Sequence, residues 1–205
     1  MKNKLQAAIR SFFALALALA VAALAATPAR AADVRPMLKA GVDFGGDPVI
    51  KVPLSDGSTR TIRANEGFFL GGGASIVNEE KDLEAEISLS LKGRAVNADN
   101  GNVTWTTVPL DALVFYRLPS FRLGGGLTYH INPQLSGSEA GATIVSANNA
   151  QFDNALGVIL QADYRFGDKI GLGLRLTGLK YHATVGGAST TYKGGGAGIV
   201  FSVSF

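Results

Sequence analysis

Apolar and polar side chains alternate along most of the chain after residue 31, and this pattern limits the possible folds more than any other feature. In the last segment, Ala197, Ile199, Phe201, Val203 and Phe205 share one face, and Gly194, Gly196, Gly198, Ser202 and Ser204 share the other. Because successive side chains of a β-strand point to opposite sides, a period of two predicts strands with two unlike faces. No run of 18 apolar residues follows Ala31, so the pattern offers no transmembrane helix.

The same alternation recurs along the chain, in places more weakly. Together with the last segment it defines eight predicted strands, at about 37–45, 68–77, 83–92, 107–117, 122–130, 156–166, 170–177 and 194–205. The connections between them are alternately long and short. The long ones are about 46–66, 93–104, 132–153 and 183–191, and the short ones are 78–82, 119–120 and 167–169. This order predicts an all-β, eight-stranded antiparallel up-and-down barrel with every tight turn at one end, as in transmembrane barrels. The first long connection also predicts a hairpin, because residues 49–54 and 59–63 flank Asp56-Gly57.

The polar faces combine glycine and serine with charges of both signs. A soluble barrel with an apolar interior is the structural alternative, but so much glycine would weaken an exposed strand surface. Inside a narrow barrel, glycine leaves room for paired charges. We therefore expect a structural network of ion pairs in the lumen, for example Glu84 and Glu86 with Arg122 or Lys92. Its expected members are Lys39, Asp43, Glu84, Glu86, Lys92, Asp111, Arg117, Arg122, Asp163, Arg165 and Arg175.

Aromatic residues gather near the ends of the predicted strands, where membrane barrels carry interfacial girdles. The group near the short turns contains Tyr116, Phe121, Tyr164, Phe166 and Phe205. The group near the long connections contains Phe44, Phe68, Trp105, Tyr129, Tyr181 and Tyr192.

Residues 1–31 are typical of a cleavable signal peptide. A basic start precedes an apolar stretch from Phe12 to Ala26, and Ala29 and Ala31 provide the small residues of a cleavage site. An N-terminal membrane anchor is the alternative, although 15 apolar residues are few for a membrane span. The expected organisation is thus a signal peptide at 1–31, with a signal helix, and a barrel domain at 32–205.

Charge and composition exclude several classes of protein. Residues 1–31 carry four of the 19 basic residues and no acid, which leaves 15 basic against 16 acidic residues in the remainder. That balance removes the main argument for nucleic-acid binding. The absence of cysteine excludes a disulfide scaffold and a thiol nucleophile. We expect no cofactor and no bound metal.

The final strand, with Ile199, Phe201, Val203 and Phe205 on one face, resembles the closing strand of bacterial outer-membrane β-barrels. The stretch Val108–Ser136 is also similar to porin-family barrels. The resemblance is to small barrels of the OmpA, OmpX or OmpW type. It implies an outer-membrane location, periplasmic termini, extracellular long loops, and a C-terminal aromatic signal read by the barrel-assembly machinery. Implied partners are periplasmic chaperones, membrane lipid and lipopolysaccharide, and the expected state is a monomer.

Few residues suggest catalysis. The glycine triplets 71–73, 124–126 and 194–196 lack the Lys-Ser/Thr of a phosphate loop, which favours a packing role. His182 and Thr184 resemble the His and Ser of lipid A deacylase barrels, but Thr replaces Ser and no acid follows Asp168. His130 is expected in the lumen or at the rim; the alternative is a metal site that it would form with Glu66 or Asp153. Lys51, Arg60, Arg63 and Lys193 form either a basic patch for lipid phosphates or an ordinary solvated surface.

The expected function is therefore that of a non-enzymatic outer-membrane barrel. It would serve envelope structure, surface interaction or limited passage of small or apolar solutes, and the loops at 46–66 and 132–153 would carry its specificity. The alternative is a lipid A-modifying enzyme that uses His182.

Overall fold

The computed structural model describes residues 33–54, 56–98, 101–139, 150–185 and 187–205. Residues 1–32 lie outside the described residues, and with them the predicted signal peptide and its cleavage residues Ala29 and Ala31. Asp33–Phe205 forms one compact unit. In its described part, no helix has the length and apolar character needed to cross a membrane.

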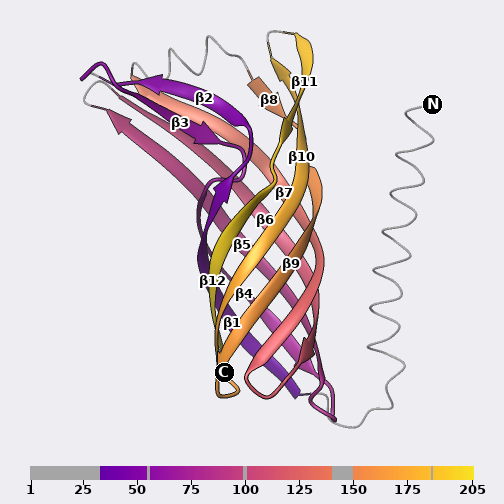
Figure 1. Ribbon diagram of the computed structural model, residues 1–205. Coiled ribbons are helices and arrows are strands. Elements are labelled where there is room, and N and C mark those ends of the chain that lie inside the picture. The colour runs from indigo at the N-terminus through magenta and orange to yellow at the C-terminus, as the bar shows by residue number, and fades with distance from the viewer. Residues whose placement is uncertain (1–32, 55, 99–100, 140–149, 186) are drawn as a thin grey trace, which may run out of the picture. The chain divides into compact units, whose positions relative to one another are not determined.

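The described residues form β-strands joined by turns (Figure 1). The strands are β1 (Asp33–Gly45), β2 (Pro48–Pro53), β3 (Thr59–Arg63), β4 (Gly67–Val77), β5 (Leu83–Ala98), β6 (Gly101–Arg117), β7 (Phe121–Glu139), β8 (Ala150–Phe152), β9 (Ala155–Phe166), β10 (Ile170–Val185), β11 (Ala188–Lys193) and β12 (Gly196–Ser204).

Eight of these strands form a closed ring. The antiparallel pairings run through β1, β4, β5, β6, β7, β9, β10 and β12, and β12 pairs again with β1. Each strand of the ring therefore has a hydrogen-bonded neighbour on both sides. This satisfies the requirement that hydrocarbon, which offers no hydrogen-bond partners, places on a spanning sheet. The predicted barrel is confirmed.

The two faces of the ring have opposite chemistry. Leucines such as Leu70, Leu91 and Leu174 point outward and are about two-thirds exposed, at 67%, 64% and 67%. The alternate positions point into the lumen, and those that carry charge are almost completely buried. Because the apolar side chains lie outside and the ions inside, this barrel is built for a lipid surrounding and not for water.

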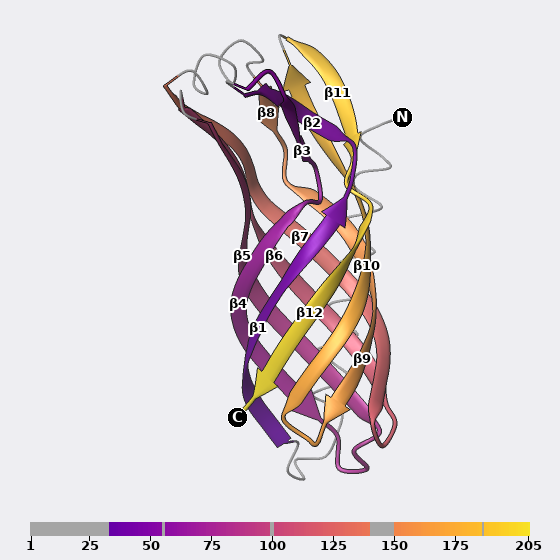
Figure 2. The ribbon, with the colours of Figure 1, turned by 60° about the vertical axis from the view of Figure 1, so that its left-hand side comes forward.

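One end of the barrel continues beyond the ring. β5, β6 and β7 extend past β4 and β9, and β10 continues into a hairpin with β11, while β2 and β3 form a separate two-stranded sheet at the same end (Figures 1 and 2). The predicted hairpin around Asp56-Gly57 is confirmed. At its tip, Ser58 hydrogen-bonds the Asp56 carboxylate and lowers the pKa of Asp56. The opposite end has the three short turns and the C-terminus.

Two expectations about this extended end were wrong. Most of residues 93–104 and 132–139 are strand rather than loop, because alternation such as that of Val96, Val103 and Trp105 continues past the apolar outer band. Residues 140–149 of the third long connection lie outside the described residues. Trp105 and Tyr181 do not belong to a lipid-facing girdle, because both are 0% exposed and share the inward parity of their strands. Tyr192, directly opposite Tyr181, packs beside them.

The outward face generates a testable prediction. Leu174→Arg places a charge in the middle of the apolar band and should lower the free energy of unfolding in lipid vesicles by about 2 to 4 kcal/mol. Asn97→Arg, on the exposed outward side of the β5 extension, should cost about 0 to 1 kcal/mol. Denaturant unfolding in vesicles measures both, and equal costs would contradict the assignment of the outer face.

Candidate functional site

The guanidinium of Arg122 on β7 is the centre of the lumen. Its Nε donates to Asp163 Oδ2 at 2.6 Å, its Nη1 to Glu84 Oε1 at 2.7 Å, and its Nη2 lies 3.2 Å from Glu86 Oε2. The guanidinium carbon also lies 4.1 Å from the centroid of the Phe115 ring, a cation–π arrangement. Arg122 thus joins carboxylates from β5 and β9 across the bore.

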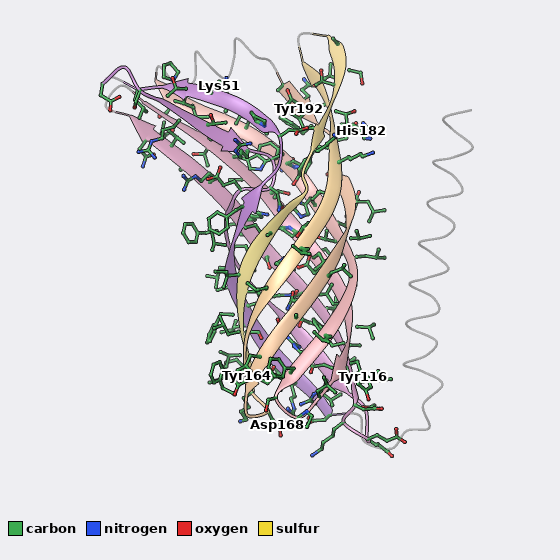
Figure 3. All side chains as sticks on the ribbon, viewed as in Figure 1. Lys51, Tyr116, Tyr164, Asp168, His182 and Tyr192 are labelled. Carbon is green, nitrogen blue, oxygen red and sulfur yellow. The ribbon has the colours of Figure 1, made fainter. Side chains whose placement is uncertain are left out.

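Glu84 extends this network toward the short-turn end. Besides Arg122, its carboxylate pairs with Arg165 at 3.1 Å and with Arg117 at 3.4 Å. Asp168, in the turn between β9 and β10, pairs with Arg117 at 3.3 Å, and its carbonyl accepts from Arg165. Figure 3 shows Asp168 at this end, close to the level of Tyr116 and Tyr164. The turn between β9 and β10 therefore forms the last contacts of the network at the short-turn end.

A second set of ion pairs fills the lumen toward the extended end. Lys39 pairs with Glu86 and lies 3.9 Å from Asp111, and Arg175 lies 3.4 Å from Asp111. Arg175 continues to Asp43 at 3.6 Å, and Asp43 accepts from Lys92 at 2.7 Å. The Arg175 guanidinium also stacks over Phe69, 5.0 Å from the ring centroid.

All eleven charged residues expected in the lumen belong to this one connected network, which we call the lumen network. Glu84 and Glu86 pair with Arg122, one of the two partners that the sequence suggested for them. The other suggested partner, Lys92, pairs instead with Asp43 and donates to Asn65 at 2.8 Å. Lys92 lies at the opposite end of the inward row of β5 from Glu84, and the glutamates are out of its reach.

Glycines on the neighbouring strands make room for the network. A Cβ on Gly198 would overlap the carboxylate of Asp43, and one on Gly173 would overlap that of Asp163. A Cβ on Gly71, Gly73, Gly124 or Gly126 would meet the backbone of an adjacent strand. The glycine triplets on β4 and β7 therefore have a packing role, because their bare backbone allows close approach.

Above the lumen network the interior becomes apolar. His130 is buried beneath this region and its Nδ1 lies 2.6 Å from the hydroxyl of Tyr181. Tyr181 packs edge-on against Trp105, with ring centroids 5.5 Å apart. The inward side of the β2–β3 hairpin joins them, and together they form what we call the apolar cap: Ile50, Val52, Ile62, Ala64, Val96, Val103, Trp105, Ala155, Leu179 and Tyr181. Sequence reasoning missed this cap, although the inward parity of Trp105 and Tyr181 signalled it.

The second histidine lies on the outside. His182 is exposed on β10 at the extended end (Figure 3), and its Nδ1 lies 3.2 Å from the hydroxyl of Thr191. Asp153 contacts His182 through the backbone, because the Asp153 amide donates to the His182 carbonyl at 2.9 Å. In the part of the chain that the structure describes, the ring is thus oriented by a hydroxyl and not by a carboxylate. The described residues also contain no group of three or more His, Cys, Asp or Glu side chains placed to bind a metal.

The remaining candidate residues lie on the surface. Ile199, Phe201, Val203 and Phe205 point outward from the β12 end of the chain, with Ile199, Phe201 and Phe205 exposed. Of the suggested basic patch, Lys51, Arg60 and Arg63 lie on the β2–β3 sheet, whereas Lys193 lies on β11 in the main sheet.

The lumen network generates a prediction about stability. Arg122→Met leaves three carboxylates without their shared partner and should lower the free energy of unfolding by about 3 to 5 kcal/mol. The exposed Arg60→Met should change it by less than about 0.5 kcal/mol. Denaturant unfolding of the detergent-refolded protein measures the difference, and a mild effect at Arg122 would show that the pairs are not formed.

A second prediction concerns the space that glycine leaves. Gly198→Ala displaces the Asp43 carboxylate from Lys92 and should cost about 1 to 3 kcal/mol of stability. Gly195→Ala is the matched control, because its Cβ would meet nothing closer than 3.6 Å. The same unfolding measurement compares them, and equal stabilities would contradict the proposed role of Gly198.

Comparisons with known proteins find similar solved structures and one matching family. Among solved structures, the chain is similar to the outer membrane protein OprG from Pseudomonas aeruginosa, with 12% identity, a TM-score of 0.45, and coverage of 86% of this chain and 97% of that one. It is also similar to Neisserial surface protein A, with 15% identity, a TM-score of 0.40, and coverage of 86% and 100%. No curated protein matches. The model of the outer membrane protein beta-barrel domain matches residues 11–205, nearly the whole sequence, and the chain belongs to this family.

Proposed function

We propose that this outer-membrane protein is a non-enzymatic barrel with a sealed lumen, which acts through its outer surface and its extended end. Its role would be envelope structure and surface interaction, with the passage of polar solutes blocked. The observation that carries the proposal is the lumen network, which crosses the bore at several levels from Arg117 and Arg165 to Lys92 and is capped by apolar side chains.

Physical reasons support a sealed bore. Eight strands enclose space for side chains and little more. A solute that entered would have to separate buried ion pairs, and each separated pair leaves an uncompensated charge at a cost of several kcal/mol. It would then meet the apolar cap, in which the side chains of Trp105 and Tyr181 are completely buried. Polar solutes thus face two successive barriers of different chemistry.

The same proposal includes an orientation. The tight turns and both ends of the barrel domain face the periplasm, and the extensions of β5, β6, β7 and β10 with the β2–β3 hairpin face outside. Short periplasmic turns and long external segments are the usual arrangement in this class. Export would use the predicted signal peptide. The outward row Ile199, Phe201, Val203 and Phe205 would be recognised by periplasmic chaperones and the assembly machinery, and the barrel would remain a monomer.

A catalytic role has weaker support. The lumen carboxylates are already engaged by basic side chains, and the ring of His182 contacts a threonine hydroxyl. A histidine base needs an orienting acid for most of its activity. We therefore place the function of the extended end in binding and not in lipid modification.

The proposal predicts the electrical behaviour of the protein. The wild type, inserted into planar bilayers, should show no discrete conductance steps, because the lumen network and the apolar cap exclude a continuous water path. A triple variant, Glu84→Ser, Glu86→Ser and Arg122→Ser, should stay silent, because the apolar cap is intact. The same variant with Trp105→Ala and Tyr181→Ala added should conduct, because it removes the central ion pairs and opens the cap.

Folding is checked separately by the heat-dependent mobility shift of the barrel on SDS gels. Regular conductance steps from a correctly folded wild-type barrel would overturn the sealed-lumen proposal. Silent bilayers with the wild type and the triple variant, and conducting bilayers with the variant that also opens the cap, would support it.

A further inference from the structure

Two lysines face each other on the outside of the barrel, just above its apolar band. Lys180 on β10 and Lys193 on β11 are directly opposite in the strand register, and both are exposed. Two outward steps below them, Leu176 on β10 lies opposite Ala197 on β12. We propose that these lysines, with a notch of bare backbone beneath them, bind the phosphorylated headgroup of a glycolipid in the outer leaflet.

The two facing ammonium groups favour the binding of an anion between them. Like charges directly opposite on neighbouring strands are destabilising. In the described part of the chain, neither ammonium group takes part in an ion pair. The nearby carboxylate of Asp47 instead accepts from the backbone amide of Lys193, at 2.8 Å. His182 and Thr191, the next outward pair, add a ring nitrogen and a hydroxyl beside the two charges.

The notch lies between the lysines and the apolar band. The register of β10 with β11 and β12 is continuous here, because the Gly194 amide donates to the Leu179 carbonyl at 2.9 Å. Gly178 and Gly195 therefore lie opposite each other, one outward step below Lys180 and Lys193. Both are exposed, and a Cβ on either would meet nothing closer than 3.5 Å.

The sides of the notch are apolar. Val158 on β9 lies next to Gly178, and Phe44 on β1 pairs with Ala197 just below Gly195. Both side chains are about half exposed, at 56% and 54%. The surface thus has, in vertical order, two cations, a shallow gap of small residues and an apolar floor. A phosphate placed above an acyl chain has the complementary order.

This order selects a lipid over a free anion. A soluble phosphate would use the lysines alone and would gain nothing from the notch, whereas a glycolipid uses both. Cationic side chains at a membrane surface each contribute to the attraction of anionic headgroups. The inference rests on the proposed orientation, in which the extended end faces the outer leaflet, and is independent of the sealed lumen.

The test measures retention of lipid by the folded, detergent-solubilised protein with native mass spectrometry. The probes are bisphosphorylated lipid A and the same lipid with both phosphates removed. Lys180→Gln with Lys193→Gln should weaken binding of the phosphorylated lipid by about fivefold for each lysine and leave the dephosphorylated lipid unaffected. Gly178→Leu with Gly195→Leu, which fills the notch, should weaken binding of both lipids.

Lys51→Gln with Arg60→Gln is the matched control, because it removes two exposed cations from the same end of the barrel. It should leave lipid retention unchanged, and millimolar inorganic phosphate should not displace the lipid. Equal retention by the wild type and the lysine variant would overturn the inference, and so would an equal loss in the control or displacement by inorganic phosphate. Failure of the sealed lumen would appear in the conductance and not in these measurements.

Discussion

The charged side chains in the lumen of this barrel are buried inside a narrow closed sheet. The bilayer demands a sheet without free edges, and eight strands meet that demand with a bore of side-chain width. Because the outer positions of every strand must be apolar, the alternate positions become the only place for polar groups. Charges held there are tolerable when they are paired, and Arg122 alone meets three carboxylates.

The interior changes chemistry along the barrel axis, and this change coincides with the extension of the sheet. Ion pairs occupy the part encircled by all eight strands. Where β4, β12 and β1 end and β5, β6 and β7 continue, the β2–β3 hairpin supplies the missing side chains, and the core becomes apolar. The hydrogen bond between His130 and Tyr181 lies at this transition. The extended end is thus a small hydrophobic core seated on a polar lumen.

Alternation along the sequence was sufficient to predict the barrel, its strand faces and the residues whose charges point inward, because a period of two assigns each side chain to a face. It was insufficient for the pairing partners. That Lys92 meets Asp43 depends on the stagger between distant strands, which no local pattern contains. Trp105 was assigned by its place near a strand end, yet its parity with Thr107 turns it inward. The apolar cap needed contacts between β2, β6 and β10 that only the fold brings together.

Thiol accessibility distinguishes a bore filled by side chains from a bore filled by water, and the chain contains no cysteine that would interfere. Ser88→Cys and Ser90→Cys place single thiols on the inward face of β5, where the native serines are buried, and Ser189→Cys places one on the exposed β11 hairpin. If the lumen is sealed, a charged, water-soluble thiol reagent should modify the thiol at position 189 rapidly. The two inward thiols should react far more slowly in the folded protein, and all three should react at equal rates after denaturation. Rapid labelling of the inward thiols in the folded barrel would mean a water-filled bore and would contradict the sealed lumen.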